Sequence, residues 1–131
     1  MSSTEVQHDN AAIVRRVYEA AFAGDATAFA AVMAEDFEED VPPVLPWGGT
    51  HRGADAFMNN VLPLLAGAVD FTSMKLISLA ADGEHVAALL TAKSIEGEEL
   101  WISEHWTMRE GKAVHMRVFY HDTTPLLKNA V

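Results

Sequence analysis

Residues 100–122 constrain the fold more than any other part of the chain. Apolar and polar side chains alternate on both sides of a Glu-Gly-Lys turn at residues 110–112, which predicts two antiparallel strands joined as a hairpin. Successive side chains of a strand point to opposite faces. One face is therefore expected to carry Leu100, Ile102, Glu104, Trp106, Met108, Val114, Met116, Val118, Tyr120 and Asp122. Two carboxylates interrupt this apolar face, and burying a carboxylate is costly without a partner or a function.

Further segments predict that this hairpin belongs to a larger sheet. Residues 71–80 and 85–95 have the composition of strands, and a Gly follows a polar residue at 82–83 and at 96–97, as in hairpins. Residues 36–41 predict a weaker, acidic strand that leads into a loop rich in Pro and Gly at residues 42–49.

The apolar residues of the first half predict helices. After a polar segment at residues 1–8 that we expect to be frayed, apolar side chains recur every three or four positions. A kink is expected at Pro63, because proline has no backbone N–H and clashes with the preceding turn. The expected helices are residues 9–23, 25–33 and 53–67.

Length and composition restrict the architecture and the partners. With 131 residues, the chain is expected to form one α+β domain over residues 1–131, with helices on one face of a curved, mostly antiparallel sheet. A formal net charge of −10 disfavours nucleic acid and anionic membranes as partners. The absence of cysteine excludes disulfides and thiol catalysis. Without a signal-peptide pattern or a transmembrane span, we expect a cytoplasmic protein.

Several short motifs, in their order and spacing, resemble those of the nuclear-transport-factor-2-like superfamily. They are YEAAFAGD at 18–25, EDF at 35–37, PWGGTHRG at 46–53, WTMREGK at 106–112 and YHDT at 120–123. The chain is most similar to the SnoaL-like polyketide cyclase and ketosteroid isomerase branches. The resemblance implies a cone-shaped α+β barrel around a deep apolar pocket, often in a dimer packed through the outer face of the sheet.

Within this superfamily, the resemblance to the cyclases is the better one. Ketosteroid isomerases have an Asp-His-Phe step whose Asp helps to form an oxyanion hole, and Glu104-His105-Trp106 occupies a similar place. Their general-base Asp at the end of the first strand is replaced by Val41, and Asp40 should point to the other face. SnoaL-like cyclases use an Asp near the end of the last strand as acid and base, and Asp122 lies at a similar place.

Three acidic residues are candidate catalytic groups. Asp122, at the expected pocket mouth, would have a raised pKa suited to proton transfer, or it could cap the following turn. Glu104, deeper in the wall, could be a protonated donor or could pair with a buried Arg or His. Glu39 would share a face with Phe37 and Val41, unless it belongs to a solvated run of charges.

Candidate substrate-binding residues come from the first helix, the loop and the sheet. Tyr18 could direct its hydroxyl into the pocket or be a core residue, and Trp47 and His51 could cover the pocket mouth or only shape the loop. The other candidates, which could equally be core, are Phe57, Trp106, Met116, Val118 and Tyr120. The histidines form no close-spaced metal motif and no dinucleotide or phosphate fingerprint occurs, so we expect neither metal nor cofactor.

These observations favour a cofactor-free acid/base enzyme of cyclase, isomerase or hydratase/hydrolase type. The substrate would be a small hydrophobic carbonyl or polyketide-like compound. Asp122 would move the proton, while Glu104, with Tyr18, would stabilise developing charge on oxygen. The alternative is a non-catalytic ligand-binding or dimerisation module of the same fold. We expect a homodimer.

Overall fold

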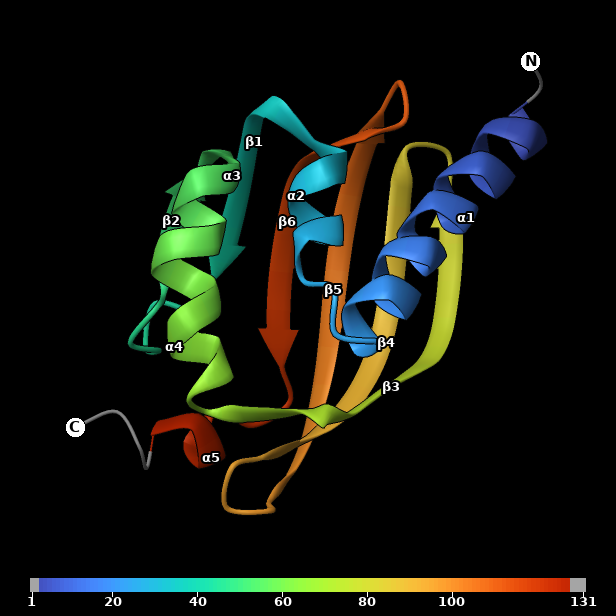
Figure 1. Cartoon of the computed structure of the whole chain (residues 1–131). Helices are drawn as coiled ribbons and strands as arrows, with labels where there is room; N and C mark the ends of the chain where they lie inside the picture. Colours follow the sequence, from blue (N-terminus) through green and yellow to red (C-terminus); the bar gives the residue numbers. More distant parts are fainter. Residues whose placement is uncertain (1–2, 128–131) are drawn as a thin grey trace.

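The structure is a computed structural model that describes residues 3–127. Its six strands form one curved sheet that does not close, and helices lie along one face of it (Figure 1). In the sheet the strands follow the order β2-β1-β6-β5-β4-β3, with β1 and β6 parallel and all other neighbours antiparallel. The strands are β1 (Met33–Val41), β2 (Gly49–Arg52), β3 (Val69–Asp82), β4 (His85–Ser94), β5 (Glu99–Arg109) and β6 (Lys112–Tyr120).

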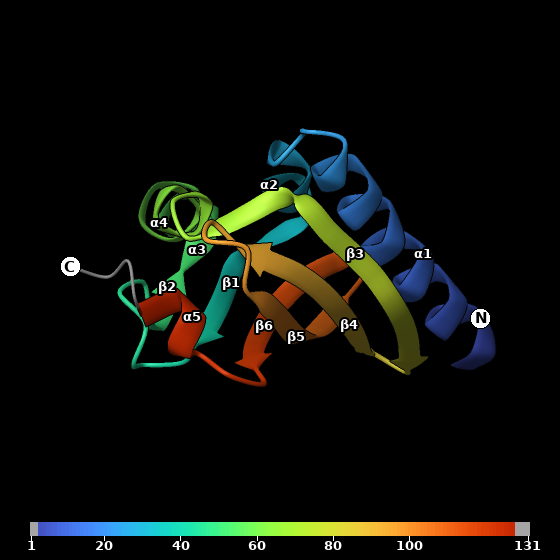
Figure 2. The ribbon, with the colours of Figure 1, turned by 90° about the horizontal axis from the view of Figure 1, so that it is seen from below.

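The helices complete the predicted α+β class, which is confirmed. Seen from below, the larger helices lie together on one side of the curved sheet (Figure 2). None of the helices in the described part of the chain combines the length and apolar character needed to cross a membrane. The helical segments are α1 (Ser3–Phe22), α2 (Thr27–Val32), α3 (Gly53–Ala56), the π-helical turn η1 (Phe57–Val61), α4 (Leu62–Ala66) and α5 (Thr124–Leu127).

The helix boundaries differ from the sequence predictions at the ends of the chain. The expectation that residues 1–8 are frayed is wrong for residues 3–8, which begin α1, while residues 1 and 2 lie outside the described residues. No Pro or Gly separates residues 3–8 from the predicted helix, so the helical backbone continues through them. At the other end, α5 forms where no helix was predicted, and Leu126 is buried.

The helix predicted around Pro63 is interrupted just before this residue. In η1 the backbone widens to a π turn, and the N–H of Leu62 donates to the carbonyl of Phe57, five residues earlier. Pro63 then occupies the first turn of α4, where its missing N–H costs no intrahelical bond. The π turn places Phe57 and Val61 on the buried side, facing the sheet.

The long C-terminal hairpin departs from simple alternation at one point. Thr107 pairs with His115 and Met108 pairs with Ala113, so Val114 is an extra residue in a β-bulge. Ala113 is fully buried and Val114 only partly, which makes the predicted inner-face position of Val114 wrong. Beyond the bulge the predicted faces hold, and Met116 and Val118 are buried.

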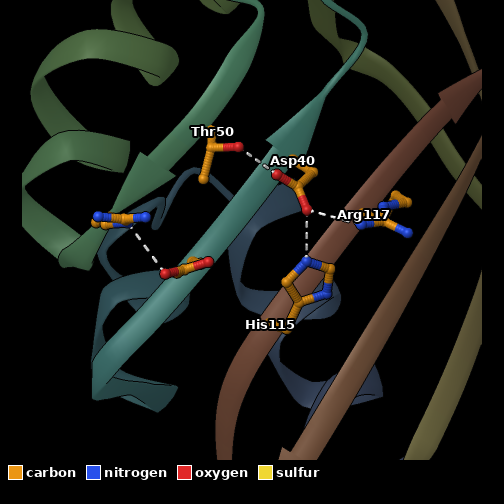
Figure 3. A network of polar contacts seen from close by, with 6 residues as sticks. Asp40, Thr50, His115 and Arg117 are labelled. Atoms are coloured by element: carbon orange, nitrogen blue, oxygen red, sulfur yellow. Dashed lines mark hydrogen bonds and ion pairs between the residues drawn. The ribbon is translucent and has the colours of Figure 1, made fainter.

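Strand β2 was not predicted, and it matters because it pairs with β1 at the edge of the sheet and supplies a hydrogen bond on the outer face. Asp40 of β1 accepts hydrogen bonds from Thr50 of β2 at 2.6 Å and from Arg117 of β6 at 2.9 Å, and His115 Nε2 lies 2.8 Å from the same carboxylate (Figure 3). These contacts, first that from Thr50, hold the pKa of Asp40 well below its usual range. These contacts connect three neighbouring strands. The preceding residue, Glu39, points to the inner face of the sheet.

Candidate active site

A largely apolar cavity lies between the helices and the inner face of the sheet. Its lining comes from α1, α2 and the residue before it, β1, the loop before β2, η1, α4 and the inner-face residues of β3, β5 and β6. The cavity volume is about 70 Å³, several times what one water molecule requires. The ionisable side chains in the lining are those of Tyr18, Glu39, Glu104 and Tyr120.

Glu39 is the least satisfied polar group of the described structure. Its side chain is 2% exposed, and its Oε1 atom is buried without a hydrogen-bond partner among the described residues. Burial raises the pKa of Glu39 from its usual value of 4.5 to about 8, and the charges of Glu104 and Asp40 act in the same direction. Glu39 therefore tends to hold a proton at neutral pH, and this proton is not engaged by another side chain.

Glu104 is held by a short chain of hydrogen bonds. The Tyr18 hydroxyl donates to Glu104 Oε1 at 2.6 Å, and it accepts from Trp106 Nε1–H at 2.8 Å. Burial raises the pKa of Glu104, and the bond from Tyr18 opposes that rise. Glu104 keeps some accessible surface because it lines the cavity, whereas Tyr18 and Trp106 are fully buried. The Tyr18 bond thus favours the ionised form of Glu104.

The two carboxyl groups differ in environment although they line one cavity. Glu104 has a hydroxyl donor, and Glu39 has no donor among the described residues. Two carboxylates that line one buried cavity are costly to ionise together, and the charge of Glu104 accordingly helps to raise the pKa of Glu39. A carboxylic acid beside a carboxylate can supply the acid and the base of a proton-transfer reaction.

Most predicted site residues come together around this cavity. Tyr18 directs its hydroxyl to the cavity acid Glu104, and Glu39 lies on the inner face with Phe37 and Val41 rather than in a solvated run of charges. The other predicted residues in the lining are Trp47, Phe57, Met116, Val118 and Tyr120.

Three predicted residues lie elsewhere. Trp106 stands behind Tyr18, and His51 Nε2 lies 2.7 Å from the carbonyl of Trp47, so that it shapes the loop without lining the cavity. Asp122 is exposed and accepts from the Thr124 N–H at 2.9 Å, contrary to its expected place in the wall. Strand β6 ends at Tyr120, so its alternation does not extend to residue 122. The catalytic role of Asp122 stays a prediction without support from this geometry.

Sequence reasoning missed part of the apolar lining. Helix periodicity indicated that several of these residues were buried, but it could not show which buried residues face a cavity. Phe29 also stacks on Trp106 with ring centroids 5.8 Å apart, behind the Tyr18 hydroxyl. The additional lining residues are Ala21, Phe22, Ala26, Phe29, Val41, Val61, Leu62, Leu65, Phe71 and Met74. Within the described part of the chain, no three His, Asp or Glu side chains converge to hold a metal ion.

Replacing Tyr18 with phenylalanine is expected to lower the free energy of unfolding by about 1–3 kcal/mol, because a buried carboxyl loses its donor and the Trp106 N–H its acceptor. Urea denaturation measures the change. Tyr120→Phe is the matched control, since the structure gives that hydroxyl no hydrogen bond to the described residues. Equal losses in the two variants would show that the Tyr18 bonds contribute nothing specific.

Comparison with known proteins supports the fold. The SnoaL-like domain family matches residues 14–116, which is most of the chain. An NTF2-like protein of Burkholderia thailandensis is 28% identical, with a TM-score of 0.77 over 92% of this chain and 95% of that chain. An NTF2-like protein of Burkholderia xenovorans is 26% identical, with a TM-score of 0.72 over 95% and 98%.

A third similar structure shares the fold at lower identity. TerC, co-crystallised with polyporic acid, is 21% identical, with a TM-score of 0.75 over 93% of this chain and 98% of that chain. No curated protein matches the chain. The family match covers well over half of the sequence, and the structural neighbours have the nuclear-transport-factor-2-like cone. The chain therefore belongs to the SnoaL-like domain family.

Proposed function

We propose that this protein is a cofactor-independent acid/base enzyme of the cyclase, isomerase or hydratase/hydrolase type. Its substrate is a small, mainly apolar carbonyl compound, such as a polyketide-like ketone. The observation that carries the proposal is the buried and unpartnered carboxyl of Glu39, which lines the same apolar cavity as the Tyr18-bonded Glu104. Membership of the SnoaL-like family supports this class of chemistry.

The different environments of the two acids suggest their roles. Glu104, whose carboxylate form accepts a hydrogen bond from the Tyr18 hydroxyl, removes a proton from the carbon next to the substrate carbonyl. Glu39, which keeps its proton because of burial, donates it to the carbonyl oxygen as negative charge develops there. The C–H electron pair becomes the C=C bond of an enol, which is the common intermediate for isomerisation and for attack on a second carbonyl.

Deuterium exchange tests this half-reaction before the natural substrate is known. Cyclopentanone, cyclohexanone and 2-tetralone are incubated with the protein in deuterated buffer at neutral pH, and loss of the α-proton signal is followed by NMR. We expect at least one ketone to exchange faster than in buffer alone, with saturation at high ketone concentration. Ketones that bind in the cavity but exchange only at the buffer rate would instead favour the non-catalytic ligand-binding alternative.

We also propose that two copies form a homodimer through the outer face of the sheet. Trp101 and Phe119, on the neighbouring strands β5 and β6, are 40% and 50% exposed and line a shallow hollow with Leu89. Exposed aromatic side chains that cluster on a sheet are typical of interfaces.

Light scattering is expected to give twice the 14.3 kDa chain mass for the wild type and a lower mass for Phe119→Asp. Val44→Asp, in the exposed loop, is the control; a monomeric wild type contradicts the proposal.

A further inference from the structure

The charged side chains of the cavity lining are all acidic. Among the described residues that line the cavity there are two carboxyl groups, those of Glu39 and Glu104, and no Lys, Arg or His. We infer that the cavity binds small apolar amines in their ammonium form, with the carboxyl pair supplying the counter-charge. This inference rests on the same cavity as the proposed function, and it adds a cationic class of ligand to the neutral carbonyl substrate.

The first support is the missing partner of Glu39. Its Oε1 atom is fully enclosed and receives no hydrogen bond from the described residues, although a buried carboxyl oxygen usually has a donor. An ammonium group has three N–H donors and no acceptor, so it can satisfy this oxygen without creating a new unpaired acceptor. Because the resulting bond joins opposite charges, it is shorter and stronger than a bond to a neutral donor.

The second support is the position of Glu104. One of its oxygens accepts from Tyr18, and this bond stabilises the carboxylate form against the burial that raises the pKa of Glu104. An ammonium ion in the cavity would meet this anionic group as well as Glu39. Burying an ion is costly unless opposite charge and hydrogen bonds compensate for lost hydration, and two carboxyl groups provide both. When the ammonium ion binds, Glu39 releases its proton to solvent, and the cavity then carries the charge that the ligand requires.

The third support is the aromatic part of the lining. Phe29 packs against Phe57 and Tyr18, with ring centroids 5.5 and 5.9 Å apart, and all three rings line the cavity. Aromatic rings attract cations through their quadrupole and also cover the apolar part of an amine. By contrast, an anionic group would face two acids with no cation in the lining, so carboxylate and phosphate ligands are excluded on electrostatic grounds.

Three ligands of equal size test the inference. Butylammonium, 1-butanol and butyrate have the same four-carbon chain, which suits a small cavity, and they differ in charge. Each is titrated into isotope-labelled wild-type protein at about 0.15 M salt, which screens non-specific attraction to the acidic surface, and the shifts of Tyr18 and Trp106 backbone signals are followed by NMR. We expect butylammonium to bind at least about tenfold more tightly than 1-butanol, and butyrate not to bind.

A pair of adjacent variants locates the effect. Glu39→Gln is expected to abolish the preference for butylammonium over 1-butanol. Glu38→Gln makes the same replacement on the same strand, but Glu38 pairs with Arg52 at 3.0 Å on the outer face, so the preference should remain. Equal affinities of the wild type for butylammonium and 1-butanol, or a preference that survives Glu39→Gln, would overturn the inference. The wild-type comparison decides the question even if the Glu39 variant does not fold.

The two proposals fail separately. Ketone exchange without selective binding of butylammonium would overturn the ammonium inference and leave the acid/base enzyme intact. Selective binding of butylammonium without exchange of any bound ketone would overturn the enzyme and leave the ammonium site. If both hold, butylammonium is also expected to inhibit exchange competitively, because the two ligands need the same carboxyl pair.

Discussion

Replacing Glu39 with glutamine is expected to slow deuterium exchange into a responsive ketone by about 10²–10⁴-fold, the usual contribution of a general acid or base. Glutamine has nearly the same shape and stays compatible with the inner face of β1, but it cannot donate a carboxylic proton. The ketone should therefore still bind, and the loss should appear in the rate at saturating ketone. NMR measurement of the exchange rate at several ketone concentrations separates the two quantities.

The neighbouring Glu38→Gln variant provides the control for this experiment. Glu38 lies on the outer face and pairs with Arg52, so its replacement should leave the exchange rate unchanged. If Glu39→Gln exchanges a ketone as fast as the wild type does, Glu39 is not the acid. The proton would then have to come from Glu104 or Tyr120, the remaining proton-bearing groups in the lining besides Tyr18.

As the pH rises from 4.5 to 8, the titration of Glu39 is expected to lower the free energy of unfolding by as much as about 4 kcal/mol. Burial raises the pKa of Glu39 from 4.5 to about 8 in the folded protein. Between these values the unfolded chain has lost the proton and the folded chain still holds it, so rising pH favours unfolding. Each unit of difference in pKa corresponds to about 1.4 kcal/mol.

A comparison of wild type and Glu39→Gln isolates this effect from all other titrating groups. Urea denaturation at a series of pH values should give similar stabilities near pH 4.5 and a more stable variant near pH 8, because glutamine does not ionise. Glu104, whose pKa is also raised, is present in both proteins, so the part of its titration that does not depend on Glu39 cancels in the difference. If the free energies of unfolding of the two proteins change in parallel across this range, burial does not raise the pKa of Glu39.

The alternation of residues along the hairpin predicted the inner face of the site well. Glu104 and Tyr120 were placed correctly because side-chain period is a local property of a strand, and a strand covered on one face shows it directly. The inner-face prediction for Asp122 failed because β6 ends at Tyr120, and side chains alternate between the two faces only within a strand. Similarly, the bulge at Val114 depends on the geometry of the turn and interrupts the period.

Glu39 shows what local pattern cannot decide. Its place beside Phe37 and Val41 favoured burial, while the run of three acids from Glu38 to Asp40 favoured solvent. The structure decides between them through contacts far apart in sequence. Parallel pairing with β6 sets Glu39 opposite Met116, and β2, too short to be recognised, pairs His51 with Glu39 on the other side. Such pairing cannot be obtained from a window of neighbouring residues.

The outer-face bonds of Asp40 have a consequence for how sequence changes in β1 act. Glu39 and Asp40 are consecutive acids on opposite faces of the sheet. Glu39 has an unpartnered oxygen on the inner face, and Asp40 has three partners on the outer face. Inserting or deleting one residue between Met33 and Glu39 would exchange them if the pairing with β6 were kept, because parity alone selects the face of a strand. After a deletion, the shorter Asp40 would take the cavity position of Glu39, and Thr50, His115 and Arg117 would face Val41. After an insertion, they would face Glu39, and Glu38 would take its cavity position. Either single-codon change would therefore alter both surfaces of the sheet at once.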